Sequence, residues 1–209
     1  VKKTKQYLEI ASAAGLLRLT PITPSTIRIS FVKGVTGTIQ DTNWKVQADT
    51  AVTWGVKESR SEVQLLTDRI LIRVEKANGA VQFLSRDGKK LLTENPSEPR
   101  LLLDSQTWNF FVWDKNERLK SKGVLADDFM DLSTKARYIS FGQKKLRMPL
   151  VLSNKGYAIG VAAGSTVLFC NVRTYGQYIY TQGTGQIDYY FIYDENQERN
   201  IEQYRNLPV

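Results

Sequence analysis

Aromatic side chains are the groups in this sequence with the clearest chemical use. The chain of 209 residues holds four tryptophans and ten tyrosines. An aromatic plane fits the apolar C–H face of a sugar ring, while nearby Asp, Asn and Gln side chains bind the hydroxyls. Trp113 with Asp114, and Tyr178 with Tyr180, best combine an aromatic plane with polar neighbours, so these four are the candidate carbohydrate contacts. Aromatic residues also favour strands and fill sandwich cores, and the sequence alone favours this structural role over sugar binding.

Paired carboxyl groups are the second candidate for chemistry. Cleavage of a glycosidic bond needs two of them, about 5–9.5 Å apart. The sequence offers Glu58 with Glu62, and the acidic group Asp127, Asp128 and Asp131. A loop or a helix N-terminus accounts better for the acidic group, because acidic side chains suit the positive end of the helix dipole. No catalytic residue is therefore assigned.

Histidine is absent from the chain, and Cys170 is its single cysteine. Without histidine, Ser-His-Asp and Cys-His nucleophiles and histidine-based metal sites are excluded. Cys170 ends the apolar run Val167–Cys170 and is predicted to be a small core residue. Neither a cofactor nor a metal site is predicted.

The formal net charge of +8 raises the question of a polyanionic partner. The basic residues are scattered, and their densest runs are Lys2–Lys5, Lys89–Lys90 and Lys144–Arg147. None of these runs lies on a predicted helix, and no nucleic-acid-binding motif is present. No nucleic acid partner is predicted.

The sequence also shows no membrane signal. No stretch approaches the ~20 apolar residues of a membrane-spanning helix. The opening residues Val1 to Lys5 are not followed by the apolar segment of a signal peptide. With the lone cysteine, these features predict a soluble, cytoplasmic protein that has no membrane partner.

The elements that must position the candidate residues are predicted to be strands. Apolar and polar residues alternate over Thr26–Phe31 and again over Arg69–Glu75. Asn78-Gly79 is typical of a hairpin turn, and Asp87-Gly88 of a second tight turn. Short strands that recur with tight turns indicate a sandwich or barrel rather than alternating βα units.

The last quarter of the chain is rich in tyrosine. Two strands are predicted, over Tyr178–Tyr180 and Ile187–Tyr193, with a turn at Gly183–Gly185 between them. Asp194 is predicted to cap a helix, with Gln197 in the capping-box position. The apolar stripe of this helix comprises Ile201, Tyr204 and Leu207. The stripe is narrow, as expected of a helix that leads into a further domain.

Three stretches, Met148–Val161, Gly185–Tyr193 and Ile201–Leu207, together resemble the N-terminal domain of glycoside hydrolase family 31, the α-glucosidase and α-xylosidase family. The first is similar to a proline-led apolar strand that meets Asn, a basic residue, Gly and Tyr. The second resembles the family's Asp-Tyr-Tyr-Phe-Ile-Tyr, and the third is like the helix that leads into the catalytic barrel. The layout of Ile22–Ile29 and Arg69–Leu92 fits the same domain.

The resemblance implies an all-β fold: an antiparallel β-supersandwich, related in shape to galactose mutarotases, over residues 1–193. Residues 194–209 would form a linker helix toward a (β/α)8 barrel of the same polypeptide. In the family that barrel carries both catalytic aspartates, and neither is expected in this chain. The implied substrate is an α-linked oligosaccharide.

Two departures from the family limit what the resemblance transfers. Many members carry Gly-Leu-Gly-Glu after the strand that matches Trp108–Trp113, and Glu117–Gly123 lacks it. Many also carry a substrate-contacting Asp before the proline-led strand, whereas Phe141–Arg147 has none. No substrate residue is therefore carried over. Mutarotase-type epimerases use histidine, so the absence of histidine also argues against epimerase activity.

The sequence therefore predicts a non-catalytic N-terminal domain of a retaining α-glycosidase. Such a domain would support the barrel and shape the entrance for the carbohydrate substrate, and would be inactive alone. The alternative is a free-standing carbohydrate-binding module with no catalytic partner.

Overall fold

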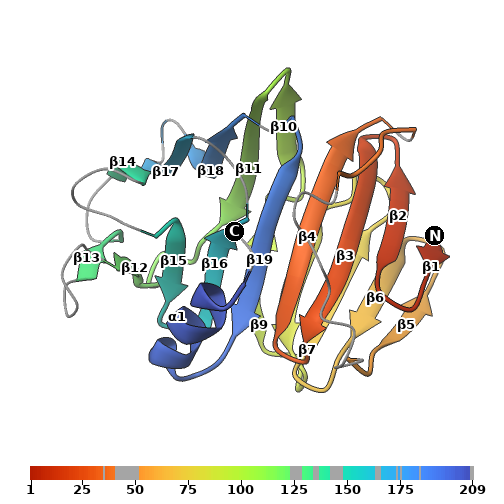
Figure 1. The fold of residues 1–209 in the computed structure, drawn as a ribbon, viewed down its shortest axis with the longest axis horizontal. Helices are drawn as coiled ribbons and strands as arrows, with labels where there is room; N and C mark the ends of the chain where they lie inside the picture. The colour runs from red at the N-terminus through yellow and green to blue at the C-terminus, as the bar shows by residue number, and fades with distance from the viewer. Residues whose placement is uncertain are drawn as a thin grey trace.

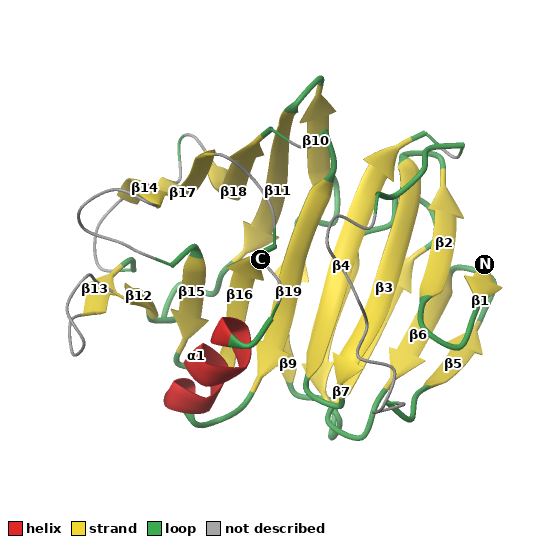
Figure 2. Ribbon diagram, viewed as in Figure 1, coloured by secondary structure: helices red, strands yellow, loops and turns green. Residues whose placement is uncertain are grey.

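The computed structural model describes residues 1–34, 36–40, 52–122, 129–133, 137–141, 148–162, 166–172, 174, 176–183 and 185–207. For residues 137–141 only the backbone is described. These residues form two β-sheets, packed face to face, and one short helix (Figures 1 and 2). Each pairing between neighbouring strands is antiparallel, so the predicted all-β sandwich is confirmed.

Sheet 1 contains the first and the last of the described strands. Its strand order is β1-β2-β3-β4-β19-β16-β15-β12-β13. Its strands are β1 (Lys2–Lys3), β2 (Leu8–Ser12), β3 (Gly15–Thr23), β4 (Thr26–Lys33), β12 (Leu119–Lys122), β13 (Phe129–Asp131), β15 (Leu150–Ser153), β16 (Tyr157–Val161) and β19 (Ile187–Tyr193).

Sheet 2 lies behind sheet 1 in the view of Figure 1. Its strand order is β14-β17-β18-β11-β9-β8-β7-β6-β5, and β10 pairs with β11 beside this path. Its strands are β5 (Gly55–Glu58), β6 (Glu62–Leu66), β7 (Ile70–Glu75), β8 (Val81–Ser85), β9 (Lys90–Glu94), β10 (Arg100–Leu103), β11 (Gln106–Val112), β14 (Arg137–Phe141), β17 (Thr166–Val172) and β18 (Gly176–Gln182).

The main core fills the space between the sheets. Every second residue of β4 and β7 is apolar and points into this core, as the sequence predicts. Phe83 of sheet 2 and Phe191 of sheet 1 stack across the interface, with ring centroids 4.1 Å apart. Cys170 is fully buried, in agreement with its predicted role.

A second apolar cluster lies on the outer face of sheet 1, under α1 (Gln197–Arg205). Tyr204 of α1 packs there on β16, and its hydroxyl donates to the carbonyl of Val161 at 2.7 Å. A Cβ at Gly160 would lie 2.2 Å from the Tyr204 ring, so only glycine allows this close packing. The buried members of the cluster are Leu150, Leu152, Ala158, Ala162, Tyr190, Ile192, Ile201 and Tyr204.

The helix begins later than the sequence predicts. Asn196, rather than Asp194, is the N-cap, and its side chain accepts from the Glu198 amide at 3.0 Å. The Asp194 carboxylate instead accepts from the Asn196 amide at 2.9 Å and so shapes the turn before the cap. Within the part of the chain that the structure describes, no helix is long and apolar enough to span a membrane.

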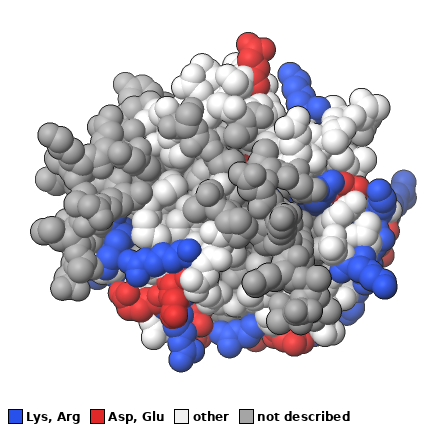
Figure 3. Space-filling view, viewed as in Figure 1, with Lys and Arg blue, Asp and Glu red and all other residues white. Residues whose placement is uncertain are grey.

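Charged side chains are mixed on the face shown in Figure 3. Lys and Arg lie mostly around its periphery, and Asp and Glu stand among them. Among the described residues on this face no continuous basic patch forms, which matches the scattered basic residues of the sequence. The run Lys144–Arg147 lies outside the described residues.

Candidate functional site

Strand β11 is unusual because two of its three aromatic residues, Trp108 and Phe110, face away from the core. Thr107, Asn109 and Phe111 are buried, whereas Trp108 and Phe110 are half-buried. Successive side chains of a strand point to opposite faces, so two polar residues point into the sandwich and two aromatic residues point out. Most half-buried strands show the opposite arrangement.

Hydrogen bonds inside the sandwich join the polar side chains that point inward. The hydroxyls of Thr107 and Thr181 lie 2.6 Å apart. The Asn109 amide donates to Glu94 at 3.2 Å, and the Tyr189 hydroxyl donates to the same carboxylate oxygen at 2.8 Å. Arg100 completes the site with an ion pair to Glu94. These contacts offset much of the cost of burying the network, although Asn109 Oδ1 and Arg100 Nε have no hydrogen-bond partner among the described residues. They allow β11 to present Trp108 and Phe110 outward.

The outward aromatic residues pair across the strands β11 and β18. Trp108 lies opposite Tyr180, and Phe110 lies opposite Tyr178. The ring centroids are 5.0 Å apart in the first pair and 5.6 Å apart in the second. The two pairs are one strand repeat apart, about 7 Å. We call these four residues the aromatic ladder.

Apolar residues border the ladder. Leu103 of β10 is 50% exposed and Val112 of β11 is 40% exposed, which makes them two of the three exposed large apolar residues in the described part of the chain. Leu101 lies directly opposite Trp108. This surface is therefore partly open to solvent and rich in apolar and aromatic area, which suits the C–H face of a sugar ring.

The structure separates the four residues that the sequence selects. Tyr178 and Tyr180 lie together on the ladder. Trp113 is only 6% exposed and packs against Phe111 and Phe169 in the core. Trp113 continues the inward-facing alternation of β11, so its ring has no open face for a sugar, and this geometry gives no support to the prediction that Trp113 is a stacking residue.

Asp114 lies in a charged cluster after β11, away from the ladder. It forms an ion pair with Lys155, which also lies 3.1 Å from the Glu117 carboxylate. The hydrogen bond from Lys155 lowers the pKa of Asp114. Burial lowers the pKa of Lys155, but its hydrogen bonds and charge contacts with Asp114 and Glu117 outweigh burial and raise this pKa. The cluster is thus a set of mutually neutralising charges.

Two buried tyrosines donate hydrogen bonds to buried carboxylates. The Tyr157 hydroxyl donates to Glu117, which also accepts from Ser153 at 2.6 Å. Burial, and then the charge of Glu117, raises the pKa of Tyr157 well above its usual range. Burial and the Glu94 charge do the same to the pKa of Tyr189. Both carboxylates are fully engaged, which identifies them as structural groups and not as free acids.

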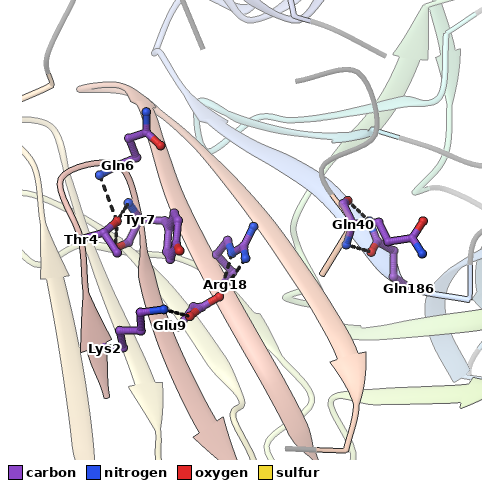
Figure 4. A network of polar contacts seen from close by, with 8 residues as sticks. All are labelled: Lys2, Thr4, Gln6, Tyr7, Glu9, Arg18, Gln40 and Gln186. Carbon is purple, nitrogen blue, oxygen red and sulfur yellow. Dashed lines mark hydrogen bonds and ion pairs between the residues drawn. The ribbon is translucent and has the colours of Figure 1, made fainter. Parts of the chain in front are cut away.

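Polar contacts also cover the outer face of sheet 1 (Figure 4). Arg18 donates to Glu9 through Nε and Nη2, at 3.1 and 2.8 Å, and its guanidinium lies over the Tyr7 ring. The Gln186 amide accepts from the Gln40 N–H and donates to its carbonyl, both at 3.1 Å. The first contact neutralises the charges of Arg18 and Glu9. The second, between Gln40 and Gln186, holds the segment 36–40 against the sheet.

The carboxyl pairs that the sequence suggested do not form a catalytic pair among the described residues. Glu58 binds Lys76 at 2.6 Å, and this hydrogen bond lowers the pKa of Glu58. Glu62 accepts from Gln64 at 2.7 Å. Asp131 accepts from the amide and hydroxyl of Ser133, both at 2.7 Å. Asp127, Asp128 and Trp44 lie outside the described residues.

Sequence comparison gives no relative. No family model matches the chain, and no curated protein matches it. Comparison of structures gives a clear result. The cycloalternan-forming enzyme of Listeria monocytogenes superposes with a TM-score of 0.77 over 99% of this chain, at 16% identity. The fold is that of a domain of glycoside hydrolase family 31 enzymes.

Two further family 31 structures agree with this result. An α-xylosidase from a soil metagenome matches 97% of the chain with a TM-score of 0.73 and 19% identity. A dextranase of Flavobacterium johnsoniae also matches 97% with a TM-score of 0.73, at 15% identity. The chain spans 21%, 33% and 28% of the Listeria, soil and Flavobacterium proteins respectively.

Sequence reasoning did not select Trp108 and Phe110 over Trp113. The run from Trp108 to Trp113 is apolar on both faces, and alternation alone cannot say which face is inward. The polar residues of the strand were the available signal. Thr107 and Asn109 share one face with Trp113, and Thr181 on the partner strand lies opposite Thr107. Buried partners for these groups became visible only with the register of β11 and β18.

Proposed function

We propose that this chain is the non-catalytic N-terminal domain of a family 31 α-glycosidase. The observation that carries the proposal is the pattern of structural coverage: nearly all of this chain matches, and it matches only a fifth to a third of each enzyme. The domain would support a (β/α)8 barrel of the same polypeptide and shape the entrance for an α-linked oligosaccharide. The catalytic carboxyl groups would then belong to the barrel.

The chemistry of the described carboxyl groups supports a non-catalytic role. Glu94 and Glu117 are each bound by several donors, and Asp114 and Glu58 are held ionised by lysines. A glycosidase acid needs a raised pKa and a second carboxyl group across the scissile bond. The direction of the Asp114 and Glu58 shifts is the opposite of what an acid requires.

An antibody raised against this chain tests the proposal on the native protein. In an extract of the source cells, the antibody should detect a protein several times larger than 23.8 kDa. The immunoprecipitate should hydrolyse aryl α-glucosides or α-xylosides, and the purified 209-residue chain should not. A native protein of about the size of this chain, without glycosidase activity, would overturn the proposal.

A free-standing carbohydrate-binding module is the second candidate, and the aromatic ladder is the observation that favours it. Two aromatic pairs on a partly open sheet face provide a stacking surface that needs no barrel. Tryptophan fluorescence of the purified chain should then saturate with maltose or isomaltose. The variant Trp108→Phe identifies the source of the signal, because Trp113 is buried and remains in place.

A further inference from the structure

A row of polar residues crosses sheet 2 beside the aromatic ladder. The strand registers pair Gln64 with Arg73, Arg73 with Gln82, Gln82 with Thr93, and Thr93 with Val112. These residues are half-buried or exposed, whereas their sequence neighbours Val63, Ile72, Phe83 and Leu92 are buried in the core. The row therefore lies on the outer face, the same face as the ladder.

Part of this row lines a shallow pocket of about 230 Å³. Drug-sized ligands occupy pockets of roughly 300–1,000 Å³, so this pocket suits a smaller group such as one sugar ring. Its lining includes the polar side chains of Arg73, Gln82 and Thr93 together with Ala80, Pro96 and part of Val81, whose side chain points into the core. Apolar atoms beside hydrogen-bonding groups are the combination that a pyranose ring requires.

Two polar atoms of the pocket residues have no hydrogen-bond partner within the described part of the chain. The Arg73 Nε and the Thr93 hydroxyl are buried without a hydrogen bond. A buried donor or acceptor without a hydrogen-bond partner is destabilising. A ligand hydroxyl would supply the missing partner after a small rotation of either side chain.

The charges around the pocket select a neutral ligand. Glu62 and Glu75 also line it, and they lie opposite each other on β6 and β7. Arg73 is the one basic residue of the lining, so the two carboxylates outnumber it and repel an anion. Carboxylates, an amide, a hydroxyl and a guanidinium together offer both donors and acceptors, which fits the hydroxyl groups of a neutral saccharide.

The pocket and the ladder are close enough to bind one molecule. Arg73 lies three strands across the sheet from Val112, and Phe110 lies two residues along β11 from Val112. Together these steps separate Arg73 from Phe110 by about 16 Å. Val112, which is exposed, lies between them as the neighbour of Thr93 across the sheet and of Phe110 along the strand. The surface from the ladder to the pocket is therefore continuous on one face.

We propose that the outer face of sheet 2 binds an extended, neutral α-linked oligosaccharide, with one sugar stacked on the aromatic ladder and a distal sugar in the Arg73–Thr93 pocket. The proposal rests on the carbohydrate function proposed above and adds a second subsite to it. It predicts that affinity depends on the length of the saccharide, because only a longer chain reaches both subsites.

Calorimetric titration of the purified chain with maltose and isomaltose series of two to seven units tests the proposal. The heptasaccharide should bind at least tenfold more tightly than the disaccharide. Arg73→Ala should abolish this gain and leave disaccharide affinity unchanged, and Thr93→Val should reduce the gain without loss of packing. Lys57→Ala is the matched control and should change nothing, because Lys57 is exposed, pairs with Gln64 at the end of the same row and lies outside the pocket.

Three outcomes would overturn the second subsite. Equal affinity for all lengths, an unchanged length dependence in both pocket variants, or preferential binding of an acidic oligogalacturonide would each do so. Thr93→Val keeps the shape of the side chain, so the test holds even if Arg73→Ala folds poorly. Failure of any saccharide to bind would also overturn it, while the size and activity of the native protein would still decide the proposed domain role separately.

Discussion

The tyrosine-rich strands β18 and β19 differ in what covers their outer faces. Strand β18 places Tyr178 and Tyr180 on an outer face of the sandwich, whereas β19 places only Tyr190 there and points Tyr189 and Tyr193 into the core. On β19 the outward Tyr190 is fully buried beneath α1, in the second apolar cluster. On β18 the outward Tyr178 and Tyr180 remain half-buried beside Phe110 and Trp108.

The difference shows that a tyrosine's role depends on the element that covers its sheet face. The helix converts the outer face of sheet 1 into a small core, where side chains contribute to stability. The face around the ladder stays partly open, so its aromatic area is available for a ligand. We therefore expect substitutions under α1 to act on folding and substitutions on the ladder to act on binding.

The largest expected effect is the loss of the Tyr204 side chain. Tyr204→Ala should lower the free energy of unfolding by about 3–5 kcal/mol, because it empties a buried aromatic site under the helix. Tyr180→Ala on the ladder should cost only about 0.2–1 kcal/mol, which is typical of a cross-strand pair. Urea denaturation of both variants measures the difference, and equal losses would break the contrast between the two faces.

Gly160→Ala should have the next largest effect. The added Cβ collides with the Tyr204 ring, and overpacking of this kind costs about 1–3 kcal/mol. In a Tyr204→Ala background the same substitution should cost far less, because the clash is gone. A double-mutant cycle measured by urea denaturation checks this coupling, and additive losses would mean that the helix does not rest on β16 in solution.

Alkaline pH should weaken the sandwich through its buried tyrosines, above all the two whose hydroxyls bind buried carboxylates. The pKa values of Tyr157 and Tyr189 are raised in the folded protein, so the folded state keeps protons that the unfolded chain releases above about pH 10. Stability is therefore intact below pH 10 and should fall above it by about 1.4 kcal/mol per pH unit for each tyrosine. Unfolding curves from pH 8 to 11 should show a shallower decline for Tyr189→Phe, and Tyr180→Phe serves as the half-buried control.

The smallest expected change in stability is that of Trp108→Ala. This half-buried residue lies on the open face, so its loss should lower the free energy of unfolding by about 1 kcal/mol or less. The same variant should lose measurable binding of short α-linked saccharides, because the larger stacking plane is removed. If the Trp108→Ala variant unfolds readily but keeps its affinity, Trp108 contributes to stability and not to saccharide binding.

Much of the fold could be predicted from the sequence because local rules govern its hairpins. The alternation over Thr26–Phe31 and Arg69–Glu75 gave the correct inward faces. The hairpin at Asn78-Gly79 formed, with Gly79 at φ 75°, but the predicted type I′ turn did not, because Asn78 lacks a positive φ and residues 76–80 form a longer connection. The helix near residue 200 was also expected, although Asn196 rather than Asp194 caps it, since Asp194 binds the Asn196 amide in the preceding turn.

The candidate site was less predictable because it depends on pairing between distant strands. Trp108 and Trp113 are five residues apart, and this odd spacing places them on opposite faces of the sheet. Which face is inward was decided by Glu94, whose buried carboxylate binds Asn109 and Tyr189. No local pattern reveals such a contact between residues that lie far apart in the chain.

The most direct test of the carbohydrate role is an NMR titration of the isotope-labelled chain with isomaltotriose and maltotriose. We predict that shifts of backbone amides and of the Trp108 indole concentrate on β11 and β18, and that β16, β19 and α1 stay unchanged. Shifts centred on the helix-covered face of sheet 1, or no shifts at millimolar saccharide, would contradict the assignment of the aromatic ladder as the carbohydrate contact.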